Sequence, residues 1–193
     1  MVRSAKPSSS GTILQLKVSL REIDPPVWRR ILIRDTTTLE KLHAIIQDAM
    51  GWQNYHLWEF LVRGEHYEAA DPEAAGRDAA KVRLKDLPLE TGESFDYGYD
   101  PGDDWQHEIV LEERLRVDPE QFYPVCTAGA RACPLEDSGG PWRYAEILEI
   151  LENPKHPEYP EIKEWIGNDF HPEAFDLRVT NRILRLAFGR GVV

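Results

Sequence analysis

The sequence predicts an α+β fold, in which a β-sheet and a few helices share one core. Residues 12–20 alternate between apolar and polar types, and this period of two is typical of a half-buried strand. Further along the chain, apolar residues recur at helical spacing instead, at Leu39, Leu42, Ile46 and Ala49. Other short alternating runs follow, separated by turn residues. The mixture of the two periodicities indicates an α+β domain.

The first elements form a strand hairpin followed by a helix. Asp24-Pro25-Pro26 breaks the chain after the first strand, and residues 27–33 form the second, so we expect antiparallel pairing. Thr37 and Glu40 have the spacing of a capping box at the start of the helix. Gly51 stands where a C-terminal glycine cap is expected.

The next elements continue the sheet. Residues 57–62 predict a third strand, and residues 68–80 predict a surface loop. A short helical turn over residues 82–87 precedes two more strands, over 95–99 and 105–112. The order hairpin, helix, strand, helical turn, strand is that of a ubiquitin-like β-grasp. We therefore expect a β-grasp-like mixed sheet with one main packed helix and an added strand.

The last third of the chain has a different composition. Residues 119–141 are rich in Pro, Gly and Cys and are expected to be irregular. A C-terminal helical segment follows, with helices over 141–152, near 161–166 and near 177–188. The Ser-rich start, residues 1–11, is expected to be a disordered lead-in to a single domain over residues 12–193. Within that domain, residues 12–118 form the β-grasp-like sheet and helix, and residues 119–193 form the irregular Cys/Gly/Pro loop and helices.

Composition limits the class of protein. The chain has 193 residues, which fits one domain, and its formal net charge of −11 argues against a general nucleic-acid binder. Two cysteines are too few for a disulfide scaffold, and no apolar run approaches the ~18 residues of a membrane helix. The start also lacks the apolar stretch of a signal peptide. We therefore expect an acidic cytoplasmic protein with no membrane partner.

Acidic residues and a histidine gather at the turn between the last two predicted strands. Asp100, Asp103, Asp104 and His107 all lie within residues 100–108. Carboxylates and an imidazole could bind a divalent metal or act as acid and base. Alternation places His107 on the apolar face, where a core histidine bonded to a neighbouring carboxylate is the favoured interpretation. The aspartates could simply cap the turn.

Both cysteines, Cys126 and Cys133, lie in the irregular loop. Six residues separate them, against two to four between the paired ligands of a typical zinc knuckle. His56, His107 or an acid would therefore have to complete a metal site. Buried free thiols are the favoured interpretation, with a disulfide or a catalytic cysteine using His107 as base as open alternatives.

The residues that follow the cysteines could hold an anion or a metal. Ser138, Gly139 and Gly140 precede a predicted helix and could bind an anion on free backbone N–H groups. The glycines could equally serve only a tight turn. Glu136 and Asp137 stand beside them and could supply metal ligands or a base.

Three further segments have favoured structural interpretations. The aromatic residues of segment 52–60 favour core packing over a platform for a flat ligand. Arg29 and Arg30 favour pairing with nearby acids over binding phosphate. Three arginines share one face of the last helix, where docking onto the acidic body is favoured over binding nucleic acid: Arg178, Arg182 and Arg185.

Several long motifs are similar to those of one known family. They are Val27-Trp28-Arg29-Arg30, Ala49-Met50-Gly51-Trp52, His56-Leu57-Trp58-Glu59-Phe60, the run from Phe95 to Ile109 and the block from Cys126 to Trp142. From about Thr12 to Leu186, the chain resembles the plasmid pRiA4b ORF-3-like family, some members of which carry a resolvase-like name because they travel with insertion elements. The resemblance implies an α+β domain and no established activity. Many relatives have a third cysteine where this chain has Ser138, which argues against a cysteine metal site.

We therefore expect a non-enzymatic binding module, associated with bacterial plasmids or mobile elements. Its protein or small-molecule partner would bind on the surface formed by residues 100–107 and 126–142. One alternative is a metal-assisted hydrolase or nuclease, with a divalent metal as cofactor and ligands or a base from Asp100, Asp103, Asp104, His107 and Glu136 or Asp137. The other alternative is a mobile-element accessory protein that acts on DNA through the C-terminal arginines, which the net charge disfavours.

Overall fold

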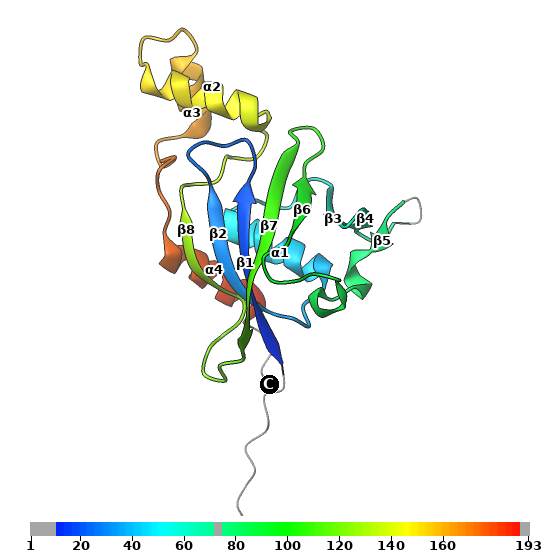
Figure 1. The fold of residues 1–193 in the computed structure, drawn as a ribbon. Coiled ribbons are helices and arrows are strands. Elements are labelled where there is room, and N and C mark those ends of the chain that lie inside the picture. The colour runs from blue at the N-terminus through cyan, green and yellow to red at the C-terminus, as the bar shows by residue number, and fades with distance from the viewer. Residues whose placement is uncertain (1–10, 72–74, 190–193) are drawn as a thin grey trace, which may run out of the picture.

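The computed structural model describes residues 11–71 and 75–189, and its centre is one sheet of eight strands (Figure 1). The strands are β1 (Thr12–Leu20), β2 (Trp28–Arg34), β3 (Trp58–Val62), β4 (Glu65–Glu68), β5 (Arg77–Asp78), β6 (Ser94–Tyr99), β7 (Trp105–Arg116) and β8 (Val125–Ala130). They lie in the order β5-β4-β3-β6-β7-β1-β2-β8. All neighbours are antiparallel except β4 and β5, which are parallel. The α+β class is confirmed, whereas the lead-in predicted over residues 1–11 lies outside the described residues apart from Gly11.

Strand β1 lies between β2 and β7 and pairs antiparallel with both. Leu16 of β1 faces Ile31 on one side and Leu111 on the other, and all three side chains are buried. The β-grasp expectation is not confirmed. It depended on the order of elements along the chain, and that order does not determine which strands pair or in which direction.

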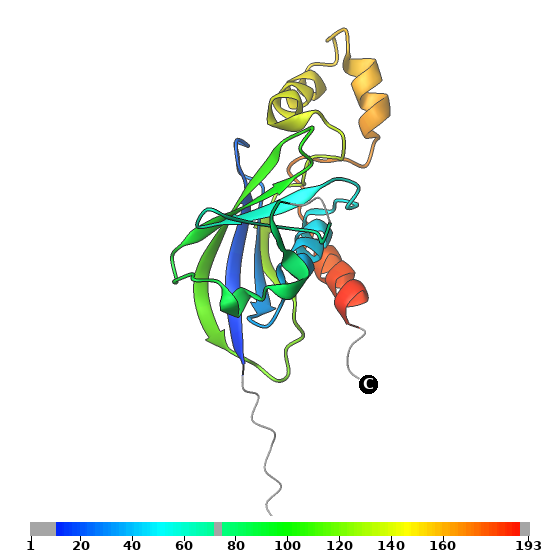
Figure 2. The same cartoon turned by 90° about the vertical axis from the view of Figure 1, so that its right-hand side faces the viewer.

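Helices α1 (Leu39–Met50) and α4 (Leu177–Phe188) lie on the same face of the sheet (Figure 2). Helix α1 ends at Gly51, whose φ of 98° is left-handed, as the sequence predicts for a glycine cap. Its N-cap is Thr38, which accepts a hydrogen bond from the Lys41 backbone N–H at 3.3 Å, and not the predicted Thr37. Thr37 instead bonds through its backbone to neighbouring segments, donating to the Arg34 carbonyl.

The stretch predicted to be irregular contains strand β8, which extends the sheet beyond β2. Its small residues, 127–129, produce no alternating apolar pattern, so periodicity alone does not detect it. Gly129 is required by packing, because a Cβ there would lie 2.7 Å from the Phe175 ring. Strands β4 and β5 were also not predicted, since they are short and lie at the edge of the sheet.

Helices α2 (Gly140–Glu152) and α3 (Tyr159–Ile166) lie together at one end of the sheet (Figures 1 and 2). They share a small apolar cluster of their own: Ile147, Ile150, Ile162 and Ile166. Helix α4 joins the main core through Leu184 and the edge of the sheet through Asn181, which bonds the Cys126 backbone. Two short 3₁₀ turns, Ala79–Lys81 and Leu84–Asp86, complete the described elements. None of the helices in residues 11–71 and 75–189 is long and apolar enough to cross a membrane.

Candidate metal centre

Two segments far apart in the sequence meet beside the β6–β7 turn. They are residues 100–104 in the turn and residues 135–140 before α2. The Asp103 Oδ2 accepts a hydrogen bond of 2.9 Å from the Gly139 backbone N–H. Gly140 lies against the Asp103 carbonyl so closely that an added Cβ would overlap that oxygen, and its φ is 77°. Only glycine therefore allows the two segments to approach in this way.

Several non-glycine residues around this junction have left-handed backbone angles. Asp100, Asp104 and Asp137 have φ of 55°, 56° and 56°, and Asn54 has φ of 58°. Asn and Asp tolerate this region better than other residues, but each such position still has a conformational cost. Strained positions of this kind gather at functional sites more often than elsewhere. Here Asp100 and Asp137 are the two that also lie close to His56.

The residues that converge at this corner are His56, Asp100, Glu136 and Asp137. The His56 Nε2 atom lies 3.5 Å from Asp100 Oδ2, 3.8 Å from Glu136 Oε2 and 3.2 Å from Asp137 Oδ1. It is inaccessible to solvent, yet it has no hydrogen-bond partner within the described part of the chain. We call these four residues the His56 cluster.

The protein holds two of the three carboxylates by hydrogen bonds. Asp100 Oδ1 accepts the Gly102 backbone N–H at 3.0 Å, and its Oδ2 faces the imidazole. Glu136 Oε1 accepts the Gln53 backbone N–H at 2.7 Å, and the Tyr99 hydroxyl lies 3.0 Å from Oε1 and 3.2 Å from Oε2, the oxygen nearer His56. Outer hydrogen bonds of this kind fix the orientation of metal ligands in known sites.

Tyr99 connects the cluster to the core. Burial raises the pKa of its hydroxyl far above the ordinary value, with a further contribution from Glu136, so the group stays protonated and donates. Its ring stacks on Trp52 with a centroid distance of 5.0 Å, and the Trp52 Nε1 donates to the Pro134 carbonyl at 2.9 Å. Trp52 and Phe60 are buried, as the core-packing interpretation of segment 52–60 predicts, whereas Tyr55 is exposed.

The spacing of the cluster suits a metal ion. In a tetrahedral or octahedral centre with bonds of about 2.1 Å, neighbouring ligand atoms lie about 3.0–3.4 Å apart. One ligand atom from each of His56, Asp100 and Asp137 lies within 4.8 Å of the others, and the His56 Nε2 atom lies 3.5 Å from Asp100 Oδ2 and 3.2 Å from Asp137 Oδ1. Small side-chain adjustments would bring these atoms to bonding distance. An imidazole nitrogen with carboxylate oxygens suits Zn²⁺, Mn²⁺ or Fe²⁺, whereas Mg²⁺ and Ca²⁺ prefer oxygen ligands alone.

The cluster is enclosed on one side and open on the other. The side chains of Asp100 and Glu136 are only 8% and 9% exposed, but that of Asp137 is 72% exposed. A groove of about 500 Å³ begins at Asp100 and runs past Leu57 and Gln106 on the outer face of β3, β6 and β7. Asp100 is the member of the cluster that lines this groove.

Asp103, Asp104 and Ser138 have structural contacts. Asp103 holds the two segments together, and Asp104 accepts from the Gln106 side chain at 2.6 Å. Ser138 is buried and donates to the Leu135 carbonyl at 2.8 Å. At Ser138, Gly139 and Gly140, where the sequence leaves open an anion site or a tight turn, the Gly139 N–H donates to the chain's own Asp103 carboxylate.

His107, Cys126 and Cys133 are buried and lie outside the cluster. His107 therefore does not contribute to an accessible surface. A carboxylate partner is expected from the sequence, but the His107 Nδ1 instead contacts the Tyr97 carbonyl at 3.2 Å. Burial lowers the pKa of His107 to about 4, so its ring is neutral at pH 7. Both cysteines are free thiols, and burial raises the pKa of each. Within residues 11–71 and 75–189, neither cysteine belongs to a group of three or more potential metal ligands.

His56 is the residue that the acidic motif did not include. The sequence indicates it only as part of an aromatic segment or as one way to complete a cysteine site. It lies in a bend two residues before β3, in the segment that joins α1 to β3, 44 positions before Asp100. Contacts over such separations depend on the sheet order, in which β3 and β6 are neighbours.

The arginines have separate structural roles. Arg30 pairs with Glu112 through two hydrogen bonds, as expected. Arg29 does not pair with an acid; it is buried and donates to the carbonyls of Ala49, Trp28 and Ala130. The three arginines of α4 are exposed and form no ion pair among the described residues: Arg178, Arg182 and Arg185. Docking of these arginines onto acidic groups is therefore not observed.

Comparisons with known proteins identify the family. A family model described as plasmid pRiA4b ORF-3-like protein matches residues 12–179. The chain is 37% identical over 167 residues to the uncharacterized protein y4hQ of Sinorhizobium fredii, which covers 85% of this chain and 86% of that protein. The fold of this chain is similar to the crystal structure of MM3350, a protein of unknown function from Methanosarcina mazei Go1, with a TM-score of 0.83. The two sequences are 38% identical, and the match covers 87% of this chain and 97% of MM3350. The chain therefore belongs to the plasmid pRiA4b ORF-3-like family.

Proposed function

We propose that the protein binds one divalent transition-metal ion at the His56 cluster and uses it in metal-assisted hydrolysis of a ligand in the adjoining groove. The observation that carries this proposal is the solvent-inaccessible His56 Nε2, which has no hydrogen bond among the described residues and faces three carboxylate oxygens. The proposal modifies the hydrolase that the sequence offers as an alternative to a binding module. It keeps Asp100, Glu136 and Asp137, replaces His107 with His56, and leaves out Asp103 and Asp104.

The charge balance of the cluster supports a cation. Three carboxylates contribute a formal charge of −3, and a protonated His56 would offset only one of these charges. Asp100 and Glu136 are nearly buried, and a buried carboxylate is costly unless it is paired or coordinates a metal. A divalent ion between them would offset most of the repulsion.

Each residue of the cluster has a distinct role in this proposal. His56, Asp100 and Asp137 would bind the ion, and Glu136, kept in place by Tyr99 and the Gln53 N–H, would add negative charge beside it. Asp137 lies at the solvent side, so it would bind the ion where a ligand from solvent can also reach it. When bound, the ion would supply Lewis acidity to a ligand or water in the remaining position.

A second candidate function is the non-enzymatic binding module expected from the sequence. Large apolar side chains are exposed close to the cluster, including Tyr55, Leu57 at 76% and Trp142 at 85%. Exposed aromatic and apolar groups of this kind favour a protein partner. In this case the metal would order the surface without catalysing a reaction.

The test of metal binding is calorimetric titration of Mn²⁺ and Zn²⁺ into protein freed of metal by a chelator. We expect one ion per chain, and an affinity at least about tenfold weaker in His56→Ala and Asp100→Asn. The matched control is His171→Ala, which removes an exposed imidazole away from the cluster. Absence of binding, or equal binding by His56→Ala, would falsify the metal centre.

The test of catalysis compares Asp137→Asn with the unmodified protein. Hydrolysis of generic phosphoester and carboxyl-ester substrates is expected with Mn²⁺ or Zn²⁺ and not with chelator, and we expect the variant to lose both metal affinity and turnover. Metal binding without hydrolysis, together with metal-dependent binding of a protein partner that Trp142→Ala abolishes, would favour the binding module instead.

A further inference from the structure

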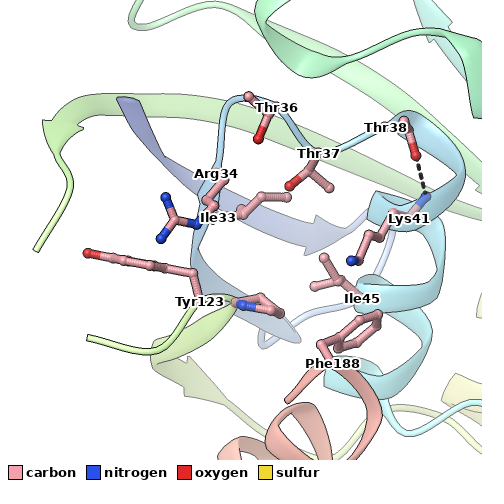
Figure 3. Close-up of a pocket in the computed structure, with 10 residues that line it drawn as sticks. Ile33, Arg34, Thr36, Thr37, Thr38, Lys41, Ile45, Tyr123 and Phe188 are labelled. Carbon is pink, nitrogen blue, oxygen red and sulfur yellow. Dashed lines mark hydrogen bonds between the residues drawn. The ribbon is translucent and has the colours of Figure 1, made fainter. Parts of the chain in front are cut away.

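A second pocket lies at the other end of α1, away from the His56 cluster. It has a volume of about 190 Å³ and lies between the end of β2, the start of α1, the segment before β8 and the end of α4 (Figure 3). The helix has 12 residues, and at about 1.5 Å per residue its two ends are roughly 18 Å apart. The pocket is thus separate from the candidate metal centre.

Two cationic side chains line this pocket, Arg34 and Lys41. None of the described lining residues is acidic, and neither cation forms an ion pair among the residues that the structure describes. Other cations of this chain, whose net charge is −11, do contact carboxylates, for example Arg21, Arg30 and Arg63. The pocket is therefore locally positive within an acidic protein.

Aromatic rings support both cations without neutralising them. The Arg34 guanidinium lies 5.5 Å from the centre of the Tyr123 ring, and the Lys41 ammonium lies 5.7 Å from the centre of the Phe188 ring. Cation–π contacts of this kind orient the charged groups and leave their N–H donors available. The two side chains can then donate to an anion between them.

The remaining walls are polar on one side and apolar on the other. Figure 3 shows Thr36 and Thr37 along one side, with Ile45 and Phe188 opposite. The threonine hydroxyls can donate to anionic oxygens. The apolar side would contact an uncharged part of the same ligand.

We propose that this pocket binds a small phosphate monoester that carries a compact apolar or planar group. Two unpaired cations match the charge of about −1.5 to −2 that such a phosphate has at pH 7. Arginine is suited to bidentate contact with phosphate, and lysine contacts it as a point charge. The volume of 190 Å³ corresponds to roughly six water molecules at about 30 Å³ each, which is room for a phosphate and a small ring.

The test uses phenyl phosphate as the probe, titrated into the full chain by calorimetry in the presence of a chelator. Inorganic phosphate and benzoate are titrated in parallel. We expect saturable binding of phenyl phosphate, tighter than either of these, that weakens as ionic strength rises. Arg34→Gln and Lys41→Gln should each weaken binding about tenfold or more. Both side chains are exposed, so these variants are expected to fold, which circular dichroism would verify.

The matched control is Lys155→Gln, which removes an exposed positive charge far from the pocket and should leave the affinity unchanged. Equal weakening in this control would show a general charge effect and overturn the proposal, as would absence of saturable binding of phenyl phosphate. Benzoate binding as tight as phenyl phosphate would overturn the assignment to a dianion. Inorganic phosphate binding as tight would overturn the role of the apolar side. Because a chelator is present throughout, failure of the metal centre does not affect these results.

Discussion

Replacing Gly140 with alanine should separate the two segments that build the His56 cluster. The substitution places a Cβ at a φ of 77° and against the Asp103 carbonyl oxygen. A left-handed backbone costs a non-glycine residue about 1–2 kcal/mol, and overpacking adds about 1–3 kcal/mol. We therefore expect Gly140→Ala to lower the free energy of unfolding by about 2–5 kcal/mol. Urea unfolding followed by tryptophan fluorescence would measure this change.

Gly92→Ala is the matched control for that experiment. Gly92 also has a left-handed φ, of 92°, but a Cβ there would have no neighbour within 4 Å. This variant should show only the backbone cost of about 1–2 kcal/mol and keep the cation affinity of the unmodified protein. Gly140→Ala should also lose cation affinity, because residues 135–140 would move away from the turn. Equal destabilisation by the two variants, with equal cation binding, would refute the claim that Gly140 docks the two segments.

Three further predictions follow from the contacts described above. Tyr99→Phe removes the hydroxyl that donates to Glu136, so it should lower the free energy of unfolding by about 1 kcal/mol and weaken cation binding about tenfold. Urea unfolding would measure the first effect and calorimetry the second. Unchanged cation affinity would contradict this role of Tyr99. Burial lowers the pKa of both His43 and His107 to about 4. Between about pH 4 and pH 6.5 the unfolded chain therefore binds more protons than the folded chain. The free energy of unfolding should fall by up to about 3 kcal/mol per histidine as the pH drops through this range. Urea unfolding at pH 7.5 and pH 4.5 tests this, and a smaller pH dependence is expected for His107→Gln. Burial raises the pKa of both thiols, so a thiol reagent should modify them only after unfolding, and rapid modification of the folded protein would show that they are accessible.

Local periodicity predicted the elements that have one buried face. The alternation in β1 and the helical spacing in α1 were sufficient, because in both cases the apolar residues pack on the same core. Strand β8 has small residues and was not predicted, since its place in the sheet depends on pairing with β2. The β-grasp topology could not be tested from the sequence for a similar reason: the pairing of β1 with β7 joins segments about ninety residues apart.

The acidic members of the candidate site were indicated by the sequence, but their histidine was not. Asp100 and Asp137 stand in turn motifs rich in Asp and Gly, which draw attention as potential ligands. The choice between His56 and His107 depends on which face of the sheet each side chain occupies. His107 lies among the core aromatic rings. His56 instead lies just before the start of β3, beside the end of β6, where Asp100 and Asp137 both come close to it.

The most direct test of the proposed metal centre is anomalous diffraction from crystals of the protein soaked in Mn²⁺ or Zn²⁺. The proposal predicts one strong anomalous peak, at about 2.0–2.2 Å from His56 Nε2 and from the carboxylate oxygens of Asp100 and Asp137. A map with no peak at these residues, in crystals whose His56 and Asp100 side chains are well defined and free of lattice contacts, would contradict it.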